Sequence, residues 1–316
     1  MAPRICLAIV LLLSMGLLAG CPTSNAPEQS VPPEGAADVN VPPPEESATS
    51  TAAERAEVPT EIPTGLTGEL AVGIPCGIAM AYKEVRDKVK AANPGLEFKD
   101  QVKNIGPMVK ELLDGKAHLD VFISIGDKEI ERLLEAGVVD GEPVPFIVQY
   151  MQLAVQLGNP LKIEALEDLG KDEIKTVAVC QPELSIGFYG QKALESVDVW
   201  SKLVSAGKVV RPDQPLKAKA LVIEKKADAA FIYACCSTKK WETDDPERSI
   251  EGKADVVMTV PKEAYGGMYG VAVVMADASN KETAHKFIQA LLVPEAQDVF
   301  ADWGYGRLDE SNRPEG

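Results

Sequence analysis

The regular alternation of short apolar runs with helical patterns over residues 69–135 is the feature that most constrains the fold. Three apolar runs read as buried strands, at residues 69–75, 96–102 and 120–124. Each run is followed by a predicted helix, at residues 77–92, 107–113 and 127–135. Strands that alternate with helices at this spacing favour right-handed crossovers and a mainly parallel sheet. In such sheets ligands bind beyond the carboxyl ends of the strands.

The alternation continues in the second half of the chain. Residues 146–157 form a long extended segment, too polar at Gln152 and Gln156 for a core helix, and we expect it to cross between two lobes. Further strands are expected at residues 176–179, 208–210 and 228–233. Further helices are expected at residues 187–196, 198–205, 215–224, 281–292 and 294–302. The prediction is therefore an α/β chain of two lobes, each a mainly parallel sheet flanked by helices, with a cleft between them.

The N-terminal region predicts that the protein is located in the cell envelope and that a flexible tether follows the signal segment. Arg4 precedes an apolar run over residues 5–18, which closes in Leu18-Ala19-Gly20-Cys21. This pattern resembles a bacterial lipoprotein signal, in which residues 1–20 are removed and Cys21 is acylated; an ordinary secretory signal is the alternative. Residues 21–66 are rich in Pro, Ser, Thr, Ala and Glu and lack aromatic residues, which predicts a disordered tether. We expect the protein in the cell envelope, lipid-anchored on the extracytoplasmic side.

The charge balance restricts the partners. The formal net charge is −16, from 32 basic and 48 acidic side chains. An excess of negative charge argues against nucleic acid as a partner and against electrostatic attachment to anionic lipid. Membrane contact is expected only through the N-terminal lipid.

Four segments, taken in order, resemble the molybdate-binding proteins of bacterial ABC importers. They are DVFISIGDKEIERLLEAGVVD (120–140), PELSIGFYGQKALESVDVWSKL (182–203), ADAAFIYACCS (227–237) and IQALLVPEAQDVFADWGYG (288–306). The resemblance implies a two-lobe periplasmic binding protein fold, with lobe 1 at residues 67–148 plus 268–316 and lobe 2 at residues 149–267. The chain would cross between the lobes near residues 148–157 and 261–270. It also implies a binding protein and not an enzyme, one that presents a small inorganic ligand to an ABC permease and its ATPase.

The expected binding residues depart from that family's pattern of serine hydroxyls, backbone N–H groups and a tyrosine. Cys76 and Gly77 stand where the first serine would be, and Asn104 or Ile105 stands near the second. The resemblance matches Tyr233 to the tyrosine, and we hypothesise that backbone N–H groups at Gly77 and Ile186 also contact the ligand. The expected ligand-binding set is Cys76, Gly77, Asn104, Cys180, Ile186, Tyr233, Cys235 and Cys236.

The cysteines do not decide which class of ligand the protein binds. Cys76, Cys180, Cys235 and Cys236 all fall at predicted strand ends that border one cleft, and thiolates suit soft metals and thiophilic species. We therefore hypothesise a metal set of these four residues, with no cofactor other than the transported metal ion or oxyanion. The alternative is a molybdate or tungstate site in which the cysteines are structural or form disulfides. A cell-surface interaction lipoprotein and a cysteine-dependent enzyme, which would lack a base, are the alternatives of another class.

Overall fold

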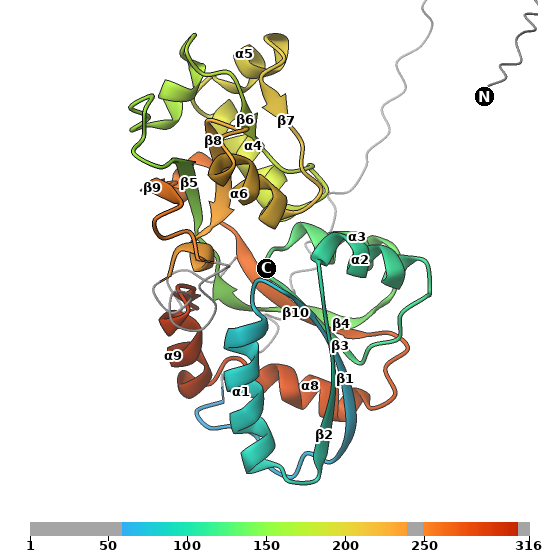
Figure 1. Cartoon of the computed structure of the whole chain (residues 1–316). Helices are drawn as coiled ribbons and strands as arrows, with labels where there is room; N and C mark the ends of the chain where they lie inside the picture. Colours follow the sequence, from blue (N-terminus) through green and yellow to red (C-terminus); the bar gives the residue numbers. More distant parts are fainter. Residues whose placement is uncertain (1–58, 239–248, 309–316) are drawn as a thin grey trace, which may run out of the picture. The chain divides into compact units, whose positions relative to one another are not determined.

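The computed structural model describes residues 59–238 and 249–308. Within these residues, six strands form a first sheet in the order β11-β4-β10-β3-β1-β2 (Figure 1). Their bounds are Gly68–Pro75 (β1), Leu96–Lys103 (β2), Val121–Ser124 (β3), Val139–Val148 (β4), Tyr269–Met275 (β10) and Gly306–Arg307 (β11). β1 pairs in parallel with β2 and β3, whereas β10 runs antiparallel to β3 and β4.

A second sheet has the order β7-β6-β8-β5-β9 in the described part of the chain. Its strands are Met151–Gln156 (β5), Val177–Ala178 (β6), Val209–Val210 (β7), Ala229–Tyr233 (β8) and Ala254–Thr259 (β9). β6 is parallel to β7 and β8, whereas β5 is antiparallel to β8 and β9. The chain leaves the first sheet between β4 and β5 and returns between β9 and β10, within the two segments expected from the sequence.

The α/β class with two helix-flanked sheets is confirmed, but the sheets are mixed and not mainly parallel. The physical reason is the route of the chain. The strands that enter or leave each sheet at a crossing, β4, β5, β9 and β10, pair antiparallel with their neighbours. Right-handed crossovers produce parallel pairs only where a helix connects two strands of one sheet. β9 and β10 were not expected from the sequence.

The helices agree with the predicted ranges to within a few residues. Those around the first sheet are Ala79–Ala92 (α1), Ile105–Leu113 (α2), Lys128–Glu135 (α3), Lys281–Ala290 (α8) and Pro294–Asp302 (α9). Those around the second are Ser185–Glu195 (α4), Trp200–Ser205 (α5) and Pro215–Ile223 (α6). Three short 3-10 turns complete the regular structure of the described residues, at Leu166–Gly170 (η1), Ala234–Ser237 (η2) and Lys262–Ala264 (η3).

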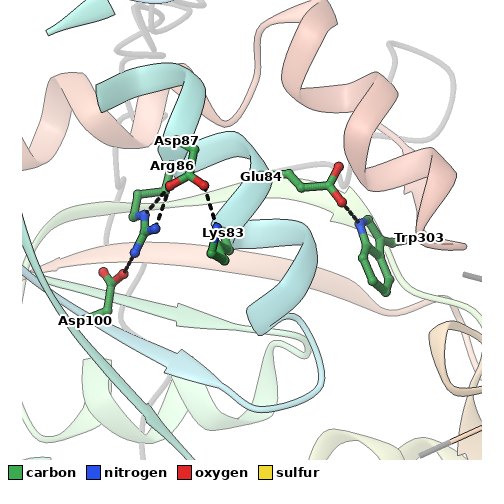
Figure 2. A network of polar contacts seen from close by, with 6 residues as sticks. All are labelled: Lys83, Glu84, Arg86, Asp87, Asp100 and Trp303. Atoms are coloured by element: carbon green, nitrogen blue, oxygen red, sulfur yellow. Dashed lines mark hydrogen bonds and ion pairs between the residues drawn. The ribbon is translucent and has the colours of Figure 1, made fainter. Parts of the chain in front are cut away.

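Helix α1 is fixed to its neighbours by polar contacts at its surface (Figure 2). The Arg86 guanidinium binds Asp100 of β2 at 2.5 Å, and the indole N–H of Trp303 donates to Glu84 at 3.0 Å. Beneath these contacts, the ring of Phe287 from α8 packs edge-on against Tyr82 and Phe98. The C-terminal segment is therefore integral to the first sheet's core, although it is remote in sequence from β1 and β2.

The predicted signal segment, Cys21 and most of the predicted tether lie outside the described residues. The last part of the tether range, 59–66, is described, and it is held by side-chain contacts: Leu66 is buried, and Asn93 binds both Pro63 and Leu66. In the described ranges, no helix combines the length and apolar character needed to cross a membrane.

Candidate functional site

A pocket of about 550 Å³, part of it open to solvent, lies where the ends of strands from both sheets meet. Its eleven lining residues come from the segments after β1, β2 and β3, from α6, and from the end of β8 with η2. They are Pro75, Cys76, Gly77, Asn104, Ile105, Ile125, Pro215, Leu216, Lys219, Tyr233 and Cys236. The location agrees with the rule that ligands bind beyond the carboxyl ends of parallel strands.

The parallel register of β1 and β2 brings Cys76 and Asn104 together. Pro75 pairs with Lys103, so the next residue of each strand lies at the same edge. The Cys76 backbone N–H donates to the Lys103 carbonyl at 3.1 Å, and its thiol lies 3.4 Å from Oδ1 of Asn104. The carbonyl of Gly77 accepts from the Tyr305 hydroxyl at 3.0 Å, which ties this turn to the C-terminal segment. Cys76, Gly77 and Asn104 therefore form one wall of the pocket.

Tyr233, the last residue of β8, also lines the pocket, and its hydroxyl is buried. The residue is 2% exposed, and its hydroxyl has no hydrogen-bond partner among the described residues. Burial raises the pKa of Tyr233 well above its ordinary value, and the charge of Glu129 adds to this. A buried polar group without a partner costs about 1–3 kcal/mol. A polar ligand atom would recover part of that penalty.

Lys219 is the one residue with a charged side chain among the eleven that line the pocket, and it was not expected from the sequence. It is 7% exposed and lies one turn beyond Pro215, the first residue of α6. Residues four apart share a helix face, so Pro215 and Lys219 both reach the pocket. Because proline has no N–H, the first turn of α6 offers one donor fewer than an ordinary helix N-terminus.

The four predicted cysteines divide into two pairs. Cys76 and Cys236 line the pocket, whereas Cys180 and Cys235 do not line it and are each 1% exposed. Burial, with a contribution from the charge of Asp213, raises the pKa of the Cys180 thiol to about 12. The hydrogen bond with Cys236, followed by burial, raises the pKa of Cys235 well above its ordinary value. Both environments favour the protonated thiol over the thiolate that metals bind.

The described residues contain no group of three or more His, Cys, Asp or Glu side chains placed to hold a metal ion. Cys76, Cys180, Cys235 and Cys236 form no disulfide within the described residues. The hypothesised set of four metal-binding cysteines is therefore not assembled here, because a position at a strand end does not determine which way a side chain points. Five residues of the expected ligand-binding set line the pocket, whereas Cys180, Ile186 and Cys235 lie outside its lining.

The N-terminus of α4, where Ile186 was expected to contribute an N–H, carries a carboxylate of the chain itself. Glu129 of α3, 1% exposed, accepts the Ser185 backbone N–H at 3.0 Å and also the Ser185 hydroxyl. The Lys128 N–H donates to the same hydroxyl at 3.1 Å. A Cβ at Gly126 would lie 2.1 Å from Ser185 Oγ, so this approach requires glycine. Nothing in the sequence pattern distinguishes Glu129 from an ordinary first-turn acid of α3.

Several known proteins resemble this chain in sequence or in fold. The molybdate-binding protein ModA of Mycobacterium tuberculosis is 26% identical over 171 residues, 54% of this chain and 63% of that protein. The chain thus spans somewhat less than two thirds of the length of the curated relatives it matches. The periplasmic molybdate-binding protein of Azotobacter vinelandii superposes with a TM-score of 0.60 at 17% identity, over 76% of this chain and 100% of that one.

The sulfate-binding protein SubI of M. tuberculosis superposes with a TM-score of 0.61 at 18% identity, covering 77% of this chain and 88% of that one. At these identities the solved structures show a shared fold alone. The match to a family model covers more of the chain than the match to ModA does. The model of bacterial extracellular solute-binding proteins matches residues 70–306, which includes every residue that lines the pocket. This chain belongs to the family of bacterial extracellular solute-binding proteins.

Proposed function

We propose that this protein is the extracytoplasmic solute-binding component of an ABC importer, and that it holds a small anion in the pocket lined by Cys76 and Tyr233. It would deliver that anion to a membrane permease driven by an ATPase. Membership of the solute-binding family supports the transport role. The names of the relatives, which bind molybdate or sulfate, support an oxyanion as the starting hypothesis.

The observation that carries the choice of an anion is the presence of Lys219 and Tyr233 in the lining of one pocket, both more than nine-tenths buried. A buried ammonium group favours a negative charge nearby, and a hydroxyl can donate to it. The soft-metal hypothesis has less support, since Cys180 and Cys235 lie outside the lining. It remains a second candidate in a narrower form, because Cys76 and Cys236 both line the pocket and two thiolates suit a thiophilic species.

Titration calorimetry of the full chain under reducing conditions tests this proposal. Molybdate, tungstate and sulfate represent oxyanions, and Zn²⁺ and Cu(I) represent the metals. Lys219→Met should weaken anion binding by more than about tenfold, since a hydrogen bond to a charged group contributes about 1.5–3 kcal/mol. Lys217→Met is the matched control, because Lys217 is an exposed lysine on the same helix that pairs with Asp213.

Lys217→Met should leave anion binding unchanged, and anion binding should persist or strengthen in Cys76→Ser, because a hydroxyl is a stronger donor than a thiol. Metal binding that disappears in Cys76→Ser and Cys236→Ser, with no anion bound by the unaltered protein, would overturn the anion proposal in favour of the thiophilic one.

We also propose that Cys21 is acylated and that the segment after it tethers the folded part to the membrane. The support is the sequence pattern that closes in Leu18-Ala19-Gly20-Cys21. Cell fractionation of Cys21→Ala is the test: the protein should move from the membrane to the soluble fraction. An unaltered membrane fraction, or an N-terminal peptide of unmodified mass, would contradict the anchor.

A further inference from the structure

The pocket's lining combines a few polar groups with a set of apolar side chains. Five of its eleven residues have purely apolar side chains: Pro75, Ile105, Ile125, Pro215 and Leu216. Ile105 and Ile125 are 5% and 3% exposed, so their side chains are fixed parts of the core. Such surfaces offer no hydrogen bonds to an oxyanion and are stabilised by contact with apolar ligand atoms.

Two helix N-termini of the second lobe, those of α4 and α6, offer fewer donors than helix ends usually do. At α6 the first residue is Pro215, which has no N–H. At α4 the Ser185 N–H and hydroxyl are already bound by the carboxylate of Glu129. A small oxyanion spreads its charge over all its oxygens, and removing these from water without replacement hydrogen bonds is unfavourable.

The polar groups that do line the pocket suit one anionic group and not a whole ion. Lys219 supplies a positive charge, Tyr233 supplies a hydroxyl without a partner, and Asn104 supplies an amide. Ile105, Ile125 and Leu216 complete the pocket around them.

We propose that the ligand is a small organic anion, with one anionic group held by Lys219, Tyr233 and Asn104 and a short apolar group against Ile105, Ile125 and Leu216. This inference rests on the proposed function, because it specifies the class of anion that the same pocket takes. It predicts that affinity depends on the apolar part of the ligand as well as on its charge.

Calorimetry with formate, propionate and pentanoate, set against molybdate and sulfate, tests the inference. Affinity should rise by up to about fourfold for each methylene that becomes buried, and the longer carboxylates should bind more tightly than either oxyanion. Leu216→Ala should flatten this dependence on chain length. Leu221→Ala, another half-buried leucine of α6 outside the pocket, is the matched control and should leave the dependence intact.

The outcomes separate the two proposals. Tight binding of molybdate or sulfate, with carboxylates weak at every length, would overturn the organic-anion inference and leave the anion-binding function standing. An absence of binding by all five anions, or binding unaffected by Lys219→Met, would overturn the proposed function itself. A chain-length dependence that persists unchanged in Leu216→Ala would place the apolar group elsewhere and overturn the assignment of this pocket wall.

Discussion

The carboxylate of Glu129 accepts the backbone N–H of Ser185 at 3.0 Å, so that a side chain of α3 caps the N-terminus of α4. A second pair lies beside it, because the Tyr189 hydroxyl donates to Asp127 at 2.5 Å. The Lys128 ammonium lies 4.6 Å from the centre of the Phe188 ring. These contacts join a helix of the first sheet to a helix of the second. Any rearrangement that separates α3 from α4 must therefore break buried hydrogen bonds.

The first prediction concerns pH. Burial raises the pKa of Glu129, although its hydrogen bonds from Ser185 partly oppose the shift. A carboxyl group whose pKa is raised by folding holds its proton in the folded state where the unfolded chain has lost it. Its contribution to stability is therefore greatest at low pH and is lost as the pH rises from the ordinary value of 4.5 through the raised one.

Glu129→Gln keeps the shape and cannot ionise; its amide oxygen can still accept the Ser185 N–H, while its amide N–H group would donate to the Ser185 hydroxyl instead of accepting from it. The free energy of unfolding of the unaltered protein minus that of Glu129→Gln should fall as the pH rises from about 5 to about 8. Urea unfolding at several pH values measures this difference. Asp127, whose pKa is likewise raised by burial, interacts with Glu129, so its own titration is read from a parallel Asp127→Asn variant. A difference that is flat or rises with pH would contradict the prediction.

The second prediction isolates the Ser185 hydroxyl. Ser185 is fully buried, and its hydroxyl binds both Glu129 and the Lys128 N–H. Ser185→Ala leaves the carboxylate and the N–H short of a partner, so it should lower the free energy of unfolding by about 1–3 kcal/mol. Ser205→Ala is the control, since that exposed hydroxyl of α5 donates only to its own helix, and its effect should stay within about 0.5 kcal/mol. Equal effects of the two substitutions would argue against the buried contact.

The third prediction contrasts two tyrosines. The hydroxyl of Tyr233 has no partner among the described residues, whereas that of Tyr189 is bound to Asp127. Tyr233→Phe should therefore leave the stability of the ligand-free protein unchanged or raise it by about 1 kcal/mol, while Tyr189→Phe should lower it by a similar amount. Unfolding measurements on both variants give the contrast. The same Tyr233→Phe variant should bind anions more weakly, and a loss of stability without a loss of affinity would argue against a ligand contact.

Local sequence patterns predicted most elements but not the pairing of the strands at the crossings. β4 contains Pro143 and Pro145, and prolines in a strand argue against that assignment unless an irregularity accommodates them. Here the pairing of β4 with β10 shifts register at two places, which allows the prolines to stay in the sheet. β10 follows Gly266 and Gly267, both with positive φ, and begins inside the range 261–270 that was expected to cross between the lobes, so no strand was expected there. Antiparallel partners distant in sequence leave no local signal.

The sequence predicted the candidate site only in part: the carboxyl ends of the strands place certain residues at one edge of a sheet. The register of β1 and β2 follows from their parallel pairing, and this alone brings Cys76 and Asn104 together. The direction of each side chain at that edge did not follow from the sequence, and Cys180 and Cys235 lie outside the lining of the pocket. Lys219 had a usable signal, because it lies four residues beyond the proline that begins α6. Glu129 had none.

The last prediction concerns where the folded part begins. Oδ1 of Asn93 accepts the Leu66 N–H at 2.8 Å, and its Nδ2 donates to the Pro63 and Val89 carbonyls at 2.8 and 2.9 Å. Removing residues 1–58 should leave the free energy of unfolding unchanged, whereas removing residues 1–66 should lower it by about 2–4 kcal/mol, from lost hydrogen bonds and the lost burial of Leu66. Asn93→Ala should lower the stability of the full chain by a similar amount and have a smaller effect in the shorter chain, because the two changes remove the same contacts. Urea unfolding of the four proteins measures this coupling, and full additivity would mean that residues 59–66 belong to the tether after all.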